Sequence, residues 1–211
     1  MPRNEKTRTR AQKKIVHASE RQTDRVRLER WLFDRHREQL EPHRLIFFDE
    51  SGINLSMARR YGRGLRGVRV EGFVPKNWGK SVTLIAGIGQ RGLLAPLMLN
   101  GSMTGDAFEA YIEQAVVPHL QYGDVLVWDN LSAHKRARVR ELVEDVGASI
   151  LFLPPYSPDL NPIELAWSKI KTLLRSRGAR TPEALEQAVA DAFFSVTECD
   201  IASWLAHCGY Y

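Results

Sequence analysis

Two aspartates follow short apolar runs of the kind that form buried strands. Asp49 comes after Leu45–Phe48, and Asp129 comes after Val125–Trp128. If the two strands are parallel neighbours, their ends lie about 4.8 Å apart, at the sheet edge where ligands of open α/β sheets gather. Two carboxylates that close repel each other unless a cation lies between them, and ligands that are all oxygen favour Mg²⁺ or Mn²⁺. The pattern therefore predicts a hard-metal site.

A third carboxylate, Glu164, lies at the start of a predicted helix. It would complete a site for two ions about 3.5–4 Å apart, which activate an attacking oxygen and stabilise the leaving oxygen at one phosphorus. That chemistry is phosphodiester hydrolysis or strand transfer. Each acid also has a purely structural interpretation, because Asp49 and Asp129 could cap the turns after their strands. With Asn161 as N-cap and Pro162 as the first helical residue, Glu164 falls where a capping-box glutamate belongs.

The elements that position these acids alternate between strands and helices. Apolar runs, turn residues and capping signals predict five strands in a mixed α/β sheet, of which the second and third form a hairpin. The expected strands are 45–51, 81–89, 93–101, 124–130 and 149–154. The expected helices are 20–40, 104–117, 135–146, 162–178, 181–196 and 198–207, with a long Gly- and Arg-rich loop at 54–80 and a rigid, proline-rich turn at 155–162.

Positive charge is concentrated before the first strand. Residues 1–40 hold 12 Lys and Arg against 6 Asp and Glu, whereas the other 171 residues hold 18 against 19. This asymmetry favours a polyanionic partner, nucleic acid first, although a solvated helical face is an alternative. We therefore divide the chain into a basic arm or linker helix at 1–40 and an α/β domain at 41–211.

The composition excludes several classes of protein. The chain has 211 residues, of which 44% are hydrophobic and 26% charged, which is typical of a folded globular protein. The two cysteines, Cys199 and Cys208, form no CxxC pair, so neither a zinc ribbon nor a disulfide framework is expected. No apolar run is long enough to span a membrane, and the polar start does not resemble a secretory signal. We expect a cytoplasmic protein with no membrane partner.

Three sequence motifs carry a family resemblance: FFDESG, VWDNLSAHK and LPPYSPDLNPIELAWSKIK. Between Asp129 of the second motif and Glu164 of the third lie 34 residues. In this order the three motifs resemble the catalytic domain of DDE transposases of the Tc/mariner superfamily, in the bacterial insertion-sequence branch, over roughly residues 40–211. The resemblance implies a ribonuclease H-like fold and a catalytic, metal-binding triad of Asp49, Asp129 and Glu164 with two Mg²⁺ or Mn²⁺ ions. It also implies cutting of transposon ends and their joining to target DNA, in the nucleoid.

The chain departs from that family at its start. Only some 40 residues precede the first predicted strand, too few for the helix-turn-helix modules of complete members. It resembles the second reading frame of a split element, so an upstream helix-turn-helix product is an expected partner. Double-stranded DNA and a second copy of the chain, in a homodimer, are the other expected partners. The alternatives are a truncated, non-catalytic DNA-binding remnant, a structure-specific nuclease such as a resolvase, and a simple α/β interaction domain.

Further residues are candidates for supporting roles. Asn130 and His134 follow the second aspartate and could orient a phosphate or a metal-bound water, although a helix-start histidine bonded to backbone is the alternative for His134. Asp159 should fix its turn through a backbone hydrogen bond, and Trp167 should anchor the core. The expected DNA contacts are Arg59, Arg60 and Arg63 in the glycine-rich loop, for which a solvated loop is the alternative, and Lys135 and Arg136 after the active-site strand.

Overall fold

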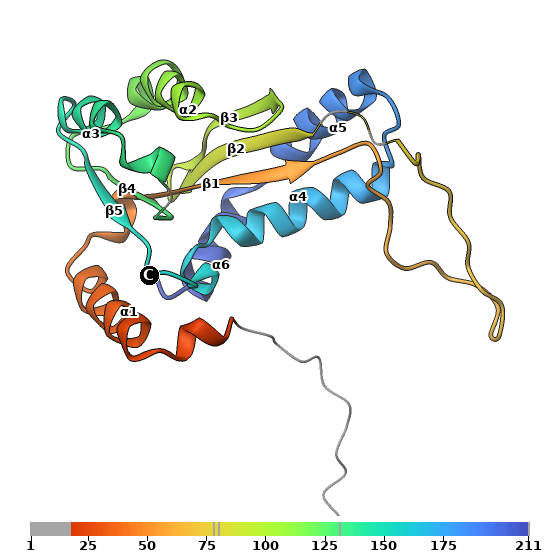
Figure 1. The fold of residues 1–211 in the computed structure, drawn as a ribbon, viewed down its shortest axis with the longest axis horizontal. Coiled ribbons are helices and arrows are strands. Elements are labelled where there is room, and N and C mark those ends of the chain that lie inside the picture. The colour runs from red at the N-terminus through yellow and green to blue at the C-terminus, as the bar shows by residue number, and fades with distance from the viewer. Residues whose placement is uncertain (1–17, 78, 80, 131, 211) are drawn as a thin grey trace, which may run out of the picture.

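A mixed five-stranded sheet with the order β3-β2-β1-β4-β5 organises the protein (Figure 1). The structure is a computed structural model that describes residues 18–77, 79, 81–130 and 132–210. The predicted α/β class and the five strands are confirmed, with only their ends shifted. Their bounds are β1 Leu45–Ile53, β2 Val82–Gly89, β3 Gly92–Asn100, β4 Val125–Trp128 and β5 Ser149–Phe152.

The register of the sheet places the two aspartates side by side. β1 pairs in parallel with β4, with Phe47 opposite Val127, and β4 pairs in parallel with β5. Asp49 and Asp129 each lie two residues beyond that pair, as the predicted parallel neighbours require. One detail was wrong: Asp49 does not end its strand, because β1 continues along antiparallel β2 as far as Ile53 after β4 has ended.

Six α-helices among the described residues surround the sheet, and threonine caps fix where three of them begin. The hydroxyls of Thr104, Thr181 and Thr197 each accept a hydrogen bond from a backbone N–H in the first turn of the helix that follows. The predicted helix at 104–117 is α-helical only to Tyr111 and continues in wider π-helical turns. The bounds are α1 Asp24–Arg37, α2 Gly105–Tyr111, α3 Ala137–Glu144, α4 Ile163–Arg177, α5 Pro182–Phe194 and α6 Glu198–His207.

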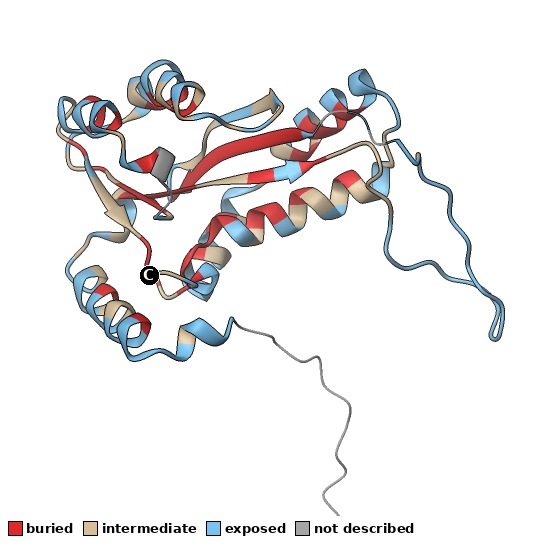
Figure 2. Ribbon diagram, in the orientation of Figure 1, coloured by how far each residue is buried: buried red, intermediate tan, exposed pale blue. Residues whose placement is uncertain are grey.

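Each face of the sheet has its own hydrophobic core, because successive side chains of a strand point to opposite faces. Phe47 belongs to the core shared with α4, α5 and α6, and the next residue, Phe48, belongs to the core shared with α2 and α3. Figure 2 shows the result as buried central strands between partly exposed helices. The core thus fixes the strand ends from which Asp49 and Asp129 project.

The helix predicted within the basic arm packs on this body. Val26 and Phe33 of α1 are buried, and the Arg37 guanidinium donates a hydrogen bond of 2.8 Å to the carbonyl of Cys208. The remainder of the predicted arm, residues 1–17, lies outside the described residues. Among the described helices, none is long and apolar enough to cross a bilayer.

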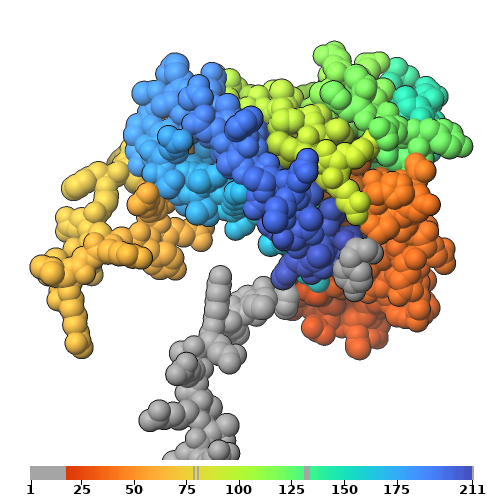
Figure 3. Space-filling model, turned by 180° about the vertical axis from the view of Figure 1, so that it is seen from behind, coloured from red at the N-terminus to blue at the C-terminus, as the bar shows by residue number. Residues whose placement is uncertain are grey.

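The glycine- and arginine-rich segment between β1 and β2 is a long exposed loop, as predicted. Its described residues form neither helix nor strand, and they stand clear of the body in Figure 3. Two of its described aromatic residues are exposed, Tyr61 by 90% and Phe73 by 91%. Leu55 and Met57, at the start of the loop, pack against the core shared with α4, whereas the described residues of the projecting part do not.

Candidate functional site

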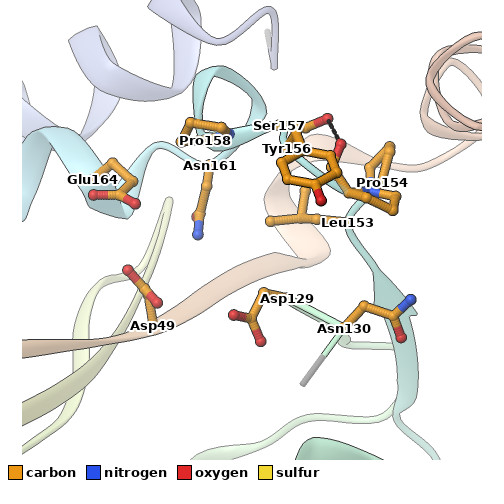
Figure 4. A pocket seen from close by; sticks show the side chains of 11 residues that line it. Asp49, Asp129, Asn130, Leu153, Pro154, Tyr156, Ser157, Pro158, Asn161 and Glu164 are labelled. Atoms are coloured by element: carbon orange, nitrogen blue, oxygen red, sulfur yellow. Dashed lines mark hydrogen bonds between the residues drawn. The ribbon is translucent and has the colours of Figure 1, made fainter. Parts of the chain in front are cut away.

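The three predicted carboxylates line one open pocket of about 340 Å³ at the carboxyl end of β4, beside the point where β1 loses its parallel partner (Figure 4). Asp49 reaches it from β1, Asp129 from the residue after β4, and Glu164 from the first turn of α4. In the close view, the Asp49 and Glu164 side chains point toward each other, and the Asp129 carboxylate lies beside them. The remaining lining residues are Asn130, Leu153, Pro154, Pro155, Tyr156, Ser157, Pro158 and Asn161.

A tight turn delivers Glu164 to the pocket. Tyr156 has a left-handed backbone with φ of 53°, which is uncommon for a residue with a side chain, and Pro158–Leu160 form a single 3-10 turn. The N-cap of α4 is Pro162, and no side chain caps the helix. The capping-box interpretation of Glu164 was therefore wrong, because α4 begins one residue later than that interpretation requires. Glu164 is left facing the pocket.

The pocket concentrates negative charge that is only partly compensated. Burial, then the neighbouring carboxylate of Glu164 and, less strongly, that of Asp129 raise the pKa of Asp49 from 3.8 to about 7. Burial also raises the pKa of Glu164. Both shifts have the same physical meaning, since a buried carboxylate near others is stable only with a proton or a cation close by.

The donor atoms fit a hard cation. All three acids offer oxygen, and Asn161, whose side chain lines the same pocket, has a buried Oδ1 that accepts no hydrogen bond in the described structure. The acids do not yet converge, because no three His, Cys, Asp or Glu side chains within the described ranges form a ready ligand cluster. A cation bound between them would offset their mutual repulsion.

Trp167 holds Asp49 in place, which the sequence analysis missed. Its indole Nε1–H donates a hydrogen bond of 3.1 Å to Asp49 Oδ2. The expectation that Trp167 is a core residue is confirmed, since only 2% of it is exposed. Its position three residues after Glu164 places both on neighbouring turns of one helix, and that spacing was the available signal. One helix thus supplies one carboxylate and orients another.

His134 supports the other aspartate rather than the pocket itself. Its Nδ1 lies 2.8 Å from Asp129 Oδ1, and its Nε2 lies 3.6 Å from Glu50 Oε1. The ring is buried against Phe108, with 4.4 Å between ring centroids. Burial alone would lower the pKa of His134, but the carboxylates of Asp129 and Glu50 raise it to about 9. At neutral pH the imidazolium therefore forms an ion pair with Asp129.

Two further candidates do not face the carboxylates. Asn130 lines the pocket, but in the close view its side chain turns away from Asp49 and Glu164. Asp159 accepts hydrogen bonds of 2.9 Å from both Arg21 and Arg30, so arginines reaching across from the N-terminal segment hold the turn. Burial would raise the pKa of Asp159, but Arg30 and then Arg21 lower it below its ordinary value. Asp159 therefore fixes its turn, as expected, and ion pairs with Arg21 and Arg30 contribute to this.

The predicted DNA contacts fall into two groups. Arg59, Arg60 and Arg63 are exposed in the loop, and no carboxylate within the described residues pairs with them. Lys135 is exposed, but Arg136 is already paired, at 2.6 Å with Asp106 and 3.3 Å with Glu109. Arg136 therefore joins α2 to the start of α3, and its contact with DNA stays a prediction.

Comparisons with known proteins agree with this geometry. A profile described as DDE superfamily endonuclease matches residues 44–186, which include all three pocket acids. No curated protein matches the sequence closely enough to count as a relative.

Among solved structures, the chain is similar to Mos1 transposase. A pre-cleavage Mos1 transpososome is 18% identical, with a TM-score of 0.74 over 98% of this chain and 69% of that chain. The mariner Mos1 paired-end complex with Mg is 17% identical, with a TM-score of 0.75 over 96% of this chain and 65% of that chain. The Mos1 catalytic domain alone is 16% identical, with a TM-score of 0.61 over 92% of this chain and 93% of that chain. These likenesses confirm the ribonuclease H-like fold, and the chain spans about two thirds of the longer Mos1 chains.

Proposed function

The chain belongs to the DDE superfamily endonucleases, and on that basis we propose that it is a metal-dependent DNA transposase of the Tc/mariner type. Such an enzyme cuts double-stranded DNA at transposon ends and joins those ends to target DNA. One observation carries the proposal: Asp49, Asp129 and Glu164, which lie far apart in the sequence, line one pocket at the carboxyl ends of two parallel strands.

In this proposal the three acids are the catalytic and metal-binding residues. They would hold two Mg²⁺ or Mn²⁺ ions, and the Mos1 paired-end complexes with Mg and with Mn support that choice. Such ions, when bound, activate the attacking oxygen and stabilise the leaving oxygen at a phosphorus. The amide of Asn161 also lines this pocket, with its nitrogen toward the acids in Figure 4, and is available to orient a water molecule or the substrate.

Neighbouring residues keep the acids in position for this chemistry. The Trp167 N–H fixes the orientation of the Asp49 carboxylate, and the His134 imidazolium fixes that of Asp129. Water attacks the phosphodiester at a transposon end, and the freed 3′-hydroxyl then attacks target DNA. Because both steps displace an oxygen at phosphorus, one set of positioned carboxylates serves both.

We also propose the finer assignments that the resemblance implied. They are the bacterial insertion-sequence branch, action in the nucleoid as a homodimer on DNA, and an upstream helix-turn-helix product as partner. That complexes of Mos1 contain paired transposon ends supports a pair of subunits. The division into an arm at 1–40 and a catalytic domain at 41–211, and DNA contacts by Arg59, Arg60, Arg63, Lys135 and Arg136, belong to the same proposal.

A comparison of two neighbouring acids tests the proposal. Supercoiled plasmid is incubated with the full chain and Mg²⁺ or Mn²⁺, and nicked and linear products are measured. Glu164→Gln removes a pocket charge, and we expect cleavage to fall by orders of magnitude with little change in melting temperature, because losing a metal ligand removes several kcal/mol of transition-state stabilisation. Asp159→Asn, the control in the turn that precedes α4, weakens the ion pairs with Arg21 and Arg30 but keeps every pocket charge, so it should retain measurable cleavage.

The outcomes separate the alternatives. Cleavage by Glu164→Gln at the rate of the unmodified chain, together with an inactive Asp159→Asn, would show that the third carboxylate is misassigned. A chain that binds duplex DNA but never cleaves it with either metal would be a non-catalytic remnant. Cleavage restricted to branched DNA would identify a structure-specific nuclease such as a resolvase.

A further inference from the structure

Helix α4 connects the carboxylate pocket to the base of the exposed loop. Its first turn carries Glu164, and its last turn ends at Arg177, beside the segment where the chain leaves β1 (Figure 1). The 15 residues of α4 span about 22 Å at 1.5 Å per residue. Any ligand that enters the pocket along this helix therefore passes over its solvent face.

The solvent face of α4 is basic beyond Glu164. Ser168, Lys171 and Arg175 follow Glu164 at intervals of four, three and four residues, which keeps them on one side of the helix. The opposite side is buried and apolar, with Ile170 and Leu174 among its members. Burial and the charge of Arg175 lower the pKa of Lys171 below its ordinary value, although Glu164 and Asp49 act in the opposite direction. The Lys171 side chain is therefore within electrostatic reach of both the pocket acids and Arg175.

Positive charge extends from the solvent face of α4 to the base of the loop. A cavity of about 360 Å³ there is lined by Arg59, Arg60, Arg175 and Arg180, with Glu71 as the one acid among its lining residues. Nη1 of Arg180 donates hydrogen bonds of 3.0 Å to the carbonyls of Leu55 and Met57, and so fixes the start of the loop against the end of α4. The fold thus holds four guanidinium groups around one cavity.

These basic residues have no acidic partners within the part of the chain that the structure describes. No carboxylate there lies within salt-bridge distance of Lys171, Arg175, Arg59 or Arg60. Helix α3, on the other side of the pocket, is different. Its Arg138 pairs with Glu113 and Glu141, and its Arg140 pairs with Glu144.

We propose that one phosphate backbone of duplex DNA lies along a track formed by Lys171, Arg175, Arg180, Arg59 and Arg60, on the α4 side of the pocket. This inference rests on the proposed function, because it takes the reacting phosphate to lie at the three carboxylates. Arg175 follows Glu164 by 11 residues, or roughly 16 Å of helix. The track therefore extends at least that far from the reacting phosphate along one strand.

The salt dependence of DNA binding tests the track. Binding of the full chain to a fluorescent 30-base-pair duplex is measured by anisotropy across a salt series, in EDTA so that no strand is cut. Removing one side chain that neutralises a phosphate should flatten the slope of log K against log salt by about 0.9. The double variant Lys171→Gln/Arg175→Gln should therefore reduce the slope by about 1.8. Melting curves verify that the variant is folded.

A matched double variant removes the same charge elsewhere. Arg138→Gln/Arg140→Gln also lowers the net charge by two, but from arginines that are already paired, so its slope should stay that of the unmodified chain. Equal slopes for all three proteins, or a flatter slope confined to the α3 variant, would overturn the track. If the unmodified chain cleaves plasmid but the α4 variant keeps its slope, only the track is wrong. If the unmodified chain neither binds nor cleaves DNA, both the track and the proposed function are wrong.

Discussion

Asp49 and Asp129 occupy matching positions, each two residues beyond the last parallel pair of β1 and β4, yet the protein holds them with opposite chemistry. Asp49 is mostly buried, has a neutral indole N–H as its side-chain donor and lies close enough to Glu164 to feel its charge. Asp129 is 43% exposed and is paired with an imidazolium. On the β4 side of the pocket the acid is therefore in an ion pair with a positive group, whereas on the β1–α4 side the charge of Lys171 acts on Asp49 and Glu164 only at longer range. The greater need for a cation lies on the β1–α4 side.

The largest effect that separates the two sides should appear in the stability of the metal-free protein. The pKa of Asp49 is about 7 when folded and near 3.9 when unfolded, so folding takes up a proton between these values. Stability should fall as the pH rises from about 4 to 7 and stay low above it, where both states are ionised. Asp49→Asn removes this penalty, so it should stabilise the protein at pH 8 by roughly 2–4 kcal/mol.

Urea unfolding in EDTA at pH 5 and pH 8 measures that difference. The gain from Asp49→Asn should shrink toward pH 5 and lower, and the same variant should lose cleavage with either metal. A variant that is less stable than the unmodified chain at pH 8 would show that the Asp49 charge is already compensated.

The β4 side should respond in a different pH window and by less. The pKa of His134 rises from 6.5 to about 9 on folding, so its contribution to stability is complete below pH 6.5 and is lost as the pH rises through 9. His134→Gln should destabilise the protein by about 1–2 kcal/mol at pH 6 and remove the decline between pH 7 and 9. Urea unfolding across this range tests the assignment. An unchanged alkaline decline in the variant would place its cause elsewhere.

The smallest expected effect concerns the neutral donor on the β1 side. Trp167→Phe keeps an aromatic ring in the core but removes the N–H that orients Asp49. A hydrogen bond to a charged group contributes about 1.5 kcal/mol, so calorimetry should show Mn²⁺ affinity weakened roughly tenfold. Trp204→Phe on α6 is the matched control, since its indole makes no hydrogen bond within the described structure. Equal losses in both variants would mean that packing, rather than the N–H, supports the site.

Local patterns in the sequence predicted the elements and the three pocket acids. Thr104 and Thr181 accept the capping bonds expected at helix starts, and Gly178 has the left-handed backbone expected where α4 ends. The parallel pairing of β1 and β4 followed from the resemblance and from the need to bring Asp49 and Asp129 together. These features depend on residues a few positions apart or on the path of the backbone, which is why the sequence contains them.

The partners of the site residues could not be predicted in the same way. The Trp167–Asp49 hydrogen bond and the Arg30–Asp159 ion pair each join residues more than 100 positions apart. Which arginines are paired with acids depends on the packing of α2 against α3, as Arg136 shows by bridging to Asp106 and Glu109. The sequence identifies the charged residues, but their pairing is a property of the tertiary structure.

The ion pairs of Asp159 set a limit on how far the protein can be shortened. The family profile begins at residue 44, yet Arg21 and Arg30 hold the turn that delivers Glu164. A fragment cut at the start of β1 would keep every pocket acid, but it would lose Phe33 of α1 from the core that α4 shares and would release that turn on one side. The folded unit that supports the third carboxylate therefore extends upstream to Arg21, beyond the stretch by which the family is recognised.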